Sequence, residues 1–203
     1  EKQIAAYDIF FNPNGTGLIN PNKVYEYWAK GAYIIISNIR DVDSNHTIIY
    51  QIPNSDPLSI NNTLDIPDNN LVYGVDMFYP WQITLQGTMP QYKESLLYPL
   101  GLEFRLDPFG TGQPRSINKD DLALYLSKVK DWSIKNQKAI LISNWGIVHY
   151  APNNSAYRYT NDLLDIFKID GFSWMYYGFR INQALDPYIA DENAKSITRT
   201  SLA

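Results

Sequence analysis

The stretch that decides the fold is Ala139-Ile140-Leu141-Ile142, which runs directly into Ser143-Asn144-Trp145-Gly146-Ile147-Val148-His149-Tyr150-Ala151-Pro152. Four consecutive apolar residues are typical of a strand that is buried on both faces. Gly146 and Pro152 indicate that the chain then leaves the strand for a loop. The pattern therefore predicts a buried strand from Ala139 to Ser143, with the amide of Asn144 at its end.

Four more segments of the same kind surround this strand, and helical patterns separate them. The expected strands are 3–11, 47–52, 71–77, 139–143 and 172–177, and the expected helices start at Pro21, run over 118–136 with Asn118 as N-cap, and end at Asp170-Gly171. Residues 79–116 show no clear periodicity. Strands that alternate with helices imply parallel βα units, so we expect one α/β domain over residues 1–203.

Composition excludes several classes of function. The chain of 203 residues carries a net charge of −4 without a basic run, which argues against nucleic-acid binding. No window approaches the roughly 18 apolar residues of a membrane span. There is no cysteine, and His46 and His149 are the two histidines, so we expect neither a disulfide nor a metal site, and no cofactor.

Four Asn-x-Ser/Thr sequons point to a location outside the cell. They stand at Asn14, Asn45, Asn61 and Asn153. Some sequons arise by chance in a chain this rich in asparagine, and a cytoplasmic protein with accidental sequons is the alternative. We expect an extracellular or cell-surface glycoprotein, with these four residues as glycosylation candidates.

Five segments, taken in order, resemble the second half of the catalytic barrel of glycoside hydrolase family 5, the cellulase-like family. The resemblance rests on residues 4–13 (IAAYDIFFNP), 39–49 (IRDVDSNHTII), 68–87, 143–152, and 162–180 with its ending Trp174-x-Tyr176-x-x-Phe179-Arg180. It implies a (β/α)8 TIM barrel, of which this chain supplies strands four to eight.

A barrel that starts at strand four has an open edge and an exposed interior. Strands one to three must then come from an upstream segment, a second polypeptide or another copy of the chain. Glu1, directly before a core strand, fits a cut or processed chain. Self-assembly and polysaccharide are the other partners that the resemblance suggests.

The resemblance also places two catalytic carboxyl groups, which retaining glycosidases hold about 5 Å apart. The acid/base position at the end of strand four holds Asn12, and the nucleophile position at the end of strand seven holds Asn144. An amide neither protonates a leaving group nor forms a glycosyl ester. The resemblance therefore predicts a pseudoenzyme.

Neighbouring positions of the family site are altered as well. Phe11 replaces an asparagine before the acid/base, Asp76 and Phe78 replace a His-x-Tyr pair on strand six, and Tyr177 partly retains the aromatic floor of strand eight. Several changes of this kind look like natural loss of the site rather than one inactivating mutation.

Two hypotheses follow. The first is a non-catalytic structural, assembly or carbohydrate-binding component, with Tyr177, Trp81, Tyr150 and Trp145 as candidate sugar-binding residues. Trp145 is also a candidate for the core. The second is an active β-glycan hydrolase of the endoglucanase or mannanase type. It would use relocated carboxylates, Asp76 with Glu103 or Asp107, whereas Asp8 is expected to make a structural hydrogen bond.

Overall fold

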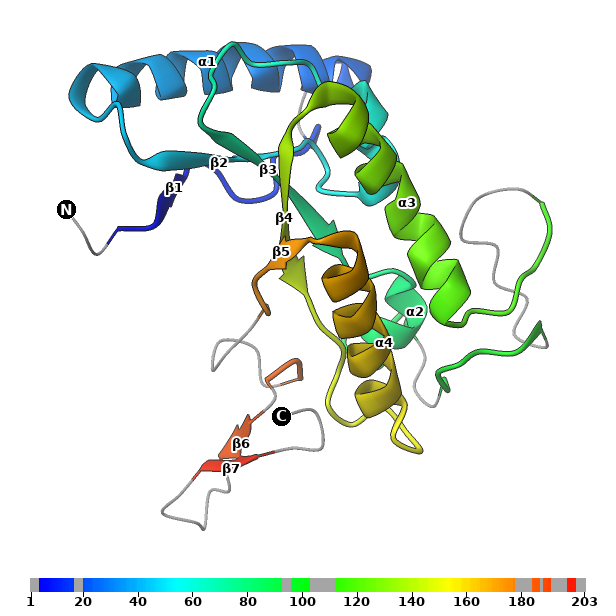
Figure 1. The fold of residues 1–203 in the computed structure, drawn as a ribbon. Coiled ribbons are helices and arrows are strands. Elements are labelled where there is room, and N and C mark those ends of the chain that lie inside the picture. The colour runs from blue at the N-terminus through cyan, green and yellow to red at the C-terminus, as the bar shows by residue number, and fades with distance from the viewer. Residues whose placement is uncertain are drawn as a thin grey trace. The chain divides into compact units, whose positions relative to one another are not determined.

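The computed structural model describes residues 4–16, 20–92, 96–102, 112–177, 184–186, 188–190 and 197–199. Its main sheet has five strands in the order β1-β2-β3-β4-β5, namely Ala6–Asp8, Thr47–Gln51, Leu71–Met77, Ala139–Trp145 and Ser173–Trp174 (Figure 1). β1 pairs in parallel with β2, and β2 pairs in parallel with β3. The prediction of a parallel α/β fold is confirmed.

Helices and shorter elements connect these strands. They are η1 (Pro21–Lys23), α1 (Val24–Val42), η2 (Pro57–Asn62), α2 (Trp81–Thr84), α3 (Lys119–Asn136) and α4 (Ser155–Asp170), and an antiparallel pair, β6 (Tyr188–Ala190) with β7 (Ile197–Arg199), follows β5. None of the helices in the described ranges is long and apolar enough to cross a membrane.

The chain divides into two compact units, and each is described by itself. Unit 1 comprises Glu1–Asp76 and Leu126–Ile142, and unit 2 comprises Met77–Tyr125 and Ser143–Ala203. The expectation of one domain over residues 1–203 stays a prediction.

A row of aromatic rings forms the core of unit 1. Trp28 of α1 stacks on Tyr50 of β2 with ring centroids 5.8 Å apart. Tyr50 meets Tyr73 of β3 edge-on, and Tyr73 packs against Trp132 of α3 at 4.9 Å. Rings of this size bury on the order of 150–250 Å² each. At about 25 cal/mol per Å², the row is a large share of what holds α1 and α3 against the strands.

The side chain of Asp43, just after α1, gathers hydrogen bonds at the amino ends of the strands. Oδ2 accepts from the Tyr7 hydroxyl at 2.9 Å and lies 2.5 Å from His46 Nδ1. Oδ1 accepts from the backbone N–H groups of Asn45 and His46 at 3.0 and 3.1 Å. These hydrogen bonds, the backbone ones first, hold the pKa of Asp43 well below its usual range.

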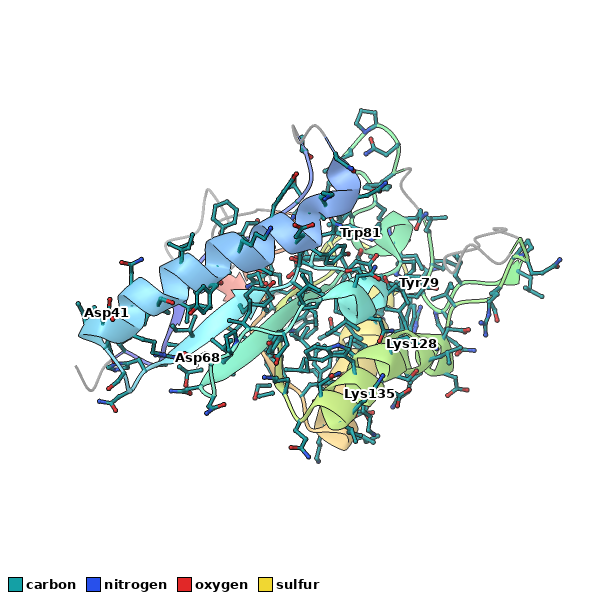
Figure 2. All side chains as sticks on the ribbon, turned by 90° about the horizontal axis from the view of Figure 1, so that it is seen from above. Asp41, Asp68, Tyr79, Trp81, Lys128 and Lys135 are labelled. Carbon is teal, nitrogen blue, oxygen red and sulfur yellow. The ribbon has the colours of Figure 1, made fainter. Side chains whose placement is uncertain are left out.

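An ion pair between Arg40 and Asp68 adjoins this carboxylate. Arg40 Nε donates to Asp68 Oδ2 at 2.7 Å, and a second nitrogen donates to Oδ1 at 3.2 Å. The guanidinium also donates to the backbone carbonyls of Asp43, His46 and Asn70. Figure 2 shows Asp68 beside the carboxyl-terminal half of α1. Both side chains are largely buried, so the pair joins α1 to the start of β3.

Unit 2 is built around α4 and the end of β4. Trp145 packs edge-on against Phe167 of α4 at 5.2 Å and against Trp174 at 5.4 Å. The Tyr159 hydroxyl donates to the backbone carbonyl of Tyr79 at 2.6 Å. The ring of Tyr79 stacks on that of Tyr125. The predicted start of α3 and the predicted end of α4 are confirmed. Asn118 accepts from the N–H of Asp120 as the N-cap of α3, and Gly171 ends α4 at a φ of 73°.

Candidate functional site

The acid/base position, Asn12, lies in the loop after β1 in unit 1. Its backbone is in the left-handed region at φ 44°, which asparagine tolerates better than most residues. Its Oδ1 is buried and has no hydrogen-bond partner among the residues that the structure describes. Phe11 beside it is exposed. An amide oxygen without a partner, next to an exposed ring, is a poor acid or base.

Asp8 belongs to the fold, as the sequence interpretation expected. Its Oδ2 accepts from Gln51 Nε2 at 3.0 Å, and its Oδ1 accepts from the N–H of Phe10. Gln51 in turn fills the space over Gly74, where an added Cβ would lie 2.6 Å from Gln51 Oε1. The side chain of Gln51 on β2 therefore bonds to Asp8 of β1 and lies over Gly74 of β3, where the missing side chain leaves room for it.

Asp76 stands one residue before the end of β3 and is 8% exposed. Its N–H donates to the carbonyl of Ser55 at 2.7 Å, which fixes the backbone at this strand end. Its proposed partners Glu103 and Asp107 lie outside the described residues. Within the described ranges, no three His, Cys, Asp or Glu side chains gather to hold a metal ion.

The nucleophile position, Asn144, lies in the part of β4 that belongs to unit 2. It is 9% exposed, and its Nδ2 is 3.5 Å from the Ser143 hydroxyl. A neutral amide, fixed in a buried strand, offers no electron pair that attacks an anomeric carbon. The structure thus places a well-packed polar side chain where the resemblance places a nucleophile.

Three aromatic rings of unit 2 meet at the end of β3. Phe78 packs edge-on against Tyr177 with centroids 5.8 Å apart and lies tilted against Trp81 at 5.6 Å. Trp81, at the start of α2, is 39% exposed, and Phe78 is nearly buried. We call Phe78, Trp81 and Tyr177 the aromatic triad. All three residues were candidates from the sequence, but the packing of Phe78 against both Trp81 and Tyr177 was not predicted.

The two remaining sugar-binding candidates differ from the triad. Trp145 is 1% exposed and packed on several sides, so it offers no ring face to solvent, and its burial fits the core interpretation instead. Tyr150 is exposed, and its hydroxyl donates to the carbonyl of Gln86 at 2.8 Å.

His149 is a titratable side chain of unit 2 that the sequence did not connect with a site. Burial lowers its pKa, and the charge of Asp186 acts in the opposite direction. Its Nδ1 is buried and has no hydrogen-bond partner. The imidazole is therefore held in its neutral form near the end of β4.

The four sequon asparagines are all exposed. Asn14 forms a local turn in which its Oδ1 accepts from the N–H of Thr16 at 2.9 Å. Asn153 precedes α4 in a left-handed conformation at φ 52°. Exposure is the condition that glycosylation requires.

The parallel βα units define an α/β protein. The family model of cellulase (glycosyl hydrolase family 5) matches residues 3–183. The chain therefore belongs to the cellulase family, glycosyl hydrolase family 5. No curated protein matches the chain.

Solved structures agree on the fold. Cel5A of Thermotoga maritima with cellobiose has a TM-score of 0.71 and 18% identity, over 93% of this chain and 56% of that one. A hyperthermophilic endo-β-1,4-glucanase with substrate gives 0.73 and 18%, over 92% and 55%. The cellulose synthase subunit Z of Clostridioides difficile gives 0.72 and 16%, over 92% and 57%. The chain spans little more than half the length of these structures, which is consistent with a partial barrel.

Proposed function

We propose that this chain is a family 5 member that binds β-glycan without hydrolysing it. The carrying observation is that both positions where the family resemblance places carboxyl groups hold amides, Asn12 and Asn144. Among the described residues Asn12 Oδ1 has no hydrogen-bond partner, and Asn144 is packed in a strand. Retention of the fold without the acid and the nucleophile leaves binding, assembly or a structural part as the remaining roles.

The aromatic triad supports a carbohydrate as the ligand. Sugar rings present C–H faces that pack on aromatic rings, and Trp81 is the exposed ring of the triad, buttressed by Phe78. The solved neighbours include structures described with cellobiose and with mannotriose. These ligands belong to those proteins, and they make β-1,4-linked glucan and mannan the first sugars to test here.

The test is a binding and turnover measurement on the protein as isolated from its source. We expect binding of cello- or manno-oligosaccharides without release of reducing ends. Trp81→Ala should weaken binding about three- to tenfold, because one stacked ring contributes about 0.5–1.5 kcal/mol. Tyr157→Ala is the matched control, since Tyr157 is another exposed aromatic residue of unit 2. Equal affinities for all three proteins would contradict the role of the triad.

An active hydrolase with a relocated carboxylate is the second candidate. The observation in its favour is Asp76, a buried carboxyl group near the carboxyl end of β3. This candidate requires turnover that Asp76→Asn abolishes while the fold persists. Turnover that Asp76→Asn leaves intact would exclude Asp76 as the acid or the nucleophile.

We propose, further, that a parallel strand and helix from polypeptide outside these residues cover the free edge of β1, as barrel strands one to three would. β1 is an end strand of the sheet, and one flank of α1 carries Tyr27, Ile34, Ile35 and Val42, all exposed. The opposite flank holds Arg40, which binds Asp68 at the start of β3. Trp28 contacts Phe10, just after β1, so the apolar flank lies on the β1 side of the helix.

The apolar flank gives this partner a direct test. Ile34→Lys places a charge on a side chain that is 61% exposed, so the chain itself should fold as before. We expect loss of the co-purifying polypeptide or, if the strands are covalently joined, a large fall in stability. Tyr33→Lys, at a side chain that is 50% exposed on the flank of Arg40, is the control. Equal behaviour of the two variants would contradict the proposal.

An extracellular location accompanies this function, and four exposed sequons support it. Intact-mass measurement before and after enzymatic removal of N-glycans tests it. We expect a mass loss that disappears stepwise in Asn14→Gln, Asn45→Gln, Asn61→Gln and Asn153→Gln. A native protein whose mass does not change on enzymatic removal of N-glycans would argue for the cytoplasmic alternative.

A further inference from the structure

The loop after β1 carries the only Asn-Gly pair of the sequence, Asn14-Gly15. Glycine has no Cβ, so its backbone nitrogen can approach the side-chain amide of the preceding asparagine without steric hindrance. Asn14 is exposed to solvent. Within the described part of the chain, no hydrogen bond uses the N–H of Gly15. The pair therefore combines an amide that water can reach with a neighbouring nitrogen that can attack it.

The side chain of Asn14 is held in a local turn. Its Oδ1 accepts from the N–H of Thr16 at 2.9 Å, and its Nδ2 donates to the carbonyl of Asn12 at 3.4 Å. This turn folds the side-chain amide over the Asn14–Gly15 peptide bond. The N–H that binds Oδ1 would also stabilise the negative charge that develops on this oxygen when a nucleophile attacks the amide carbon. The local geometry thus activates Cγ of Asn14.

Other asparagines of unit 1 lack a reactive nitrogen after them. Asn54 is also exposed, but the N–H of Ser55 donates to the carbonyl of Ile52 at 3.0 Å. Proline, which has no N–H, follows Asn12 and Asn20. At these positions the next nitrogen is held by a hydrogen bond or has no proton to lose, so Asn14 differs from them in structure as well as in sequence.

We propose that Asn14 is a site of self-modification, at which the chain converts its own asparagine into isoaspartate or aspartate. The nitrogen of Gly15 attacks Cγ of Asn14, a new N–Cγ bond forms, and the Cγ–Nδ2 bond breaks. The proton of the Gly15 N–H ends on the departing ammonia, and a cyclic imide remains. Water then adds to one of the two imide carbonyls and breaks its bond to nitrogen. One opening gives aspartate, and the other gives isoaspartate.

The modification changes the loop after β1 in charge and in length. A carboxylate replaces the neutral amide of Asn14, and isoaspartate adds one methylene group to the backbone. The Nδ2 that now donates to the Asn12 carbonyl is lost. A glycan on Asn14 needs the same Nδ2, so the glycan and isoaspartate exclude each other on one molecule. The inference is independent of whether the chain binds or hydrolyses sugar, and a protein without sugar binding should still convert.

Peptide mapping of the folded native protein, incubated at neutral and at mildly alkaline pH, tests the inference. Cleavage after Lys2 and Lys23 releases a peptide that contains Asn14. Methylation by a protein isoaspartyl methyltransferase identifies isoaspartate in it. Enzymatic removal of a glycan produces aspartate alone, so isoaspartate is the diagnostic product. We expect conversion to be faster at the higher pH, because the Gly15 nitrogen must lose its proton before it attacks.

Two substitutions isolate the reaction. Thr16→Val removes the hydroxyl of the sequon but keeps the N–H that binds Asn14, so no glycan shields the site and isoaspartate should accumulate. Gly15→Ala, added to that variant, places a Cβ beside the attacking nitrogen and should slow conversion at least about tenfold. Gly15 is not in the left-handed region, so alanine fits its backbone. Absence of isoaspartate in Thr16→Val, or an equal rate with and without Gly15→Ala, would overturn the inference.

Ser55→Gly is the matched structural control, because it places a glycine after the exposed Asn54. Glycine adopts the φ of 51°, and Ser55 Oγ has no hydrogen-bond partner within the described residues, so the fold should persist. Its N–H stays bonded to the Ile52 carbonyl. In Thr16→Val/Ser55→Gly we expect Asn54 to convert at least about tenfold more slowly than Asn14, and the two rates to converge in urea. Equal rates in the folded protein would overturn the inference, because the sequence alone would then explain the reaction.

Discussion

The two ends of the strands in unit 1 differ in how their polar groups are satisfied. At the amino ends, Asp43 and the Arg40–Asp68 pair share a continuous network in which both carboxylates have several donors. At the carboxyl ends, Asn12 Oδ1 and Ser55 Oγ are buried without a hydrogen-bond partner. Buried polar atoms without partners are rare, and each costs about 1–3 kcal/mol.

The difference suggests that polar residues at the amino ends stabilise the fold, whereas those at the carboxyl ends are not required for it. The amino-end charges join helix to strand and contribute to stability in any member of the fold. Under our proposal, carboxyl groups at the other end serve catalysis in active members of the family, and amides there leave the sheet intact. The account therefore expects large stability effects at the amino ends and small ones at the carboxyl ends.

The largest effect should come from Arg40→Met. The change leaves the Asp68 carboxylate and three backbone carbonyls without the guanidinium that now binds them. Removing one partner of a largely buried pair costs about 3 kcal/mol. Urea denaturation measures the free energy of unfolding, with Lys30→Met on the exposed side of α1 as a control that should unfold as the native protein does.

Gly74→Ala should follow, with a loss of about 1–3 kcal/mol. The new Cβ would lie 2.6 Å from Gln51 Oε1, so Gln51 must move and its hydrogen bond to Asp8 must break. Gly31→Ala is the matched control, because no atom lies within 4 Å of its added Cβ. That partly exposed helical site should gain about 0.5–1 kcal/mol, and the same sign for both variants would contradict this explanation.

Acid should weaken the amino-end network at the carboxylates of Asp43 and Asp68. Hydrogen bonds lower the pKa of Asp43, and the Arg40 hydrogen bond lowers that of Asp68. A lowered folded-state pKa stabilises the fold above the unfolded value of about 3.9, and this contribution is lost as the pH falls below it. Unfolding free energies at pH 7, 4 and 3 should therefore fall less steeply in Asp43→Asn than in the native protein. Parallel curves would show that Asp43 is not the group being titrated.

The smallest effect should come from Asn12→Gly at the carboxyl ends. Glycine adopts the φ of 44° without strain, and the change removes a buried oxygen that has no partner. Loss of the unpaired oxygen favours the folded state, and the extra freedom of glycine favours the unfolded chain, so we expect a net change within about 1 kcal/mol in the free energy of unfolding. A loss above 2 kcal/mol would mean that Asn12 is a structural residue and would break the contrast between the two ends.

Local patterns predicted the elements well. The bounds of β3 came from the apolar run 71–77, and Asn118 and Gly171 marked helix limits because their side chain or backbone acts within a few residues. β5 is only Ser173–Trp174, shorter than the predicted 172–177. α2 has four residues, fewer than a periodic pattern needs, so the sequence could not indicate it.

Long-range contacts were beyond the sequence. Tyr7 and Asp43 are 36 residues apart, and nothing local marks them as partners. The resemblance predicted that Asn12 and Asn144 are altered positions, and this stays a prediction. The support of Trp81 by Phe78 depends on how the loop after β3 folds. No local sequence pattern marks such residues as neighbours, so only the three-dimensional structure reveals these groupings.

Release of reducing sugar by the native protein tests the central claim most directly. The account predicts no release from β-1,4-glucan or β-1,4-mannan across the pH range in which the protein stays folded, together with measurable binding of their oligosaccharides. Turnover that persists on purification and disappears in Asp76→Asn, with the fold retained, would contradict it.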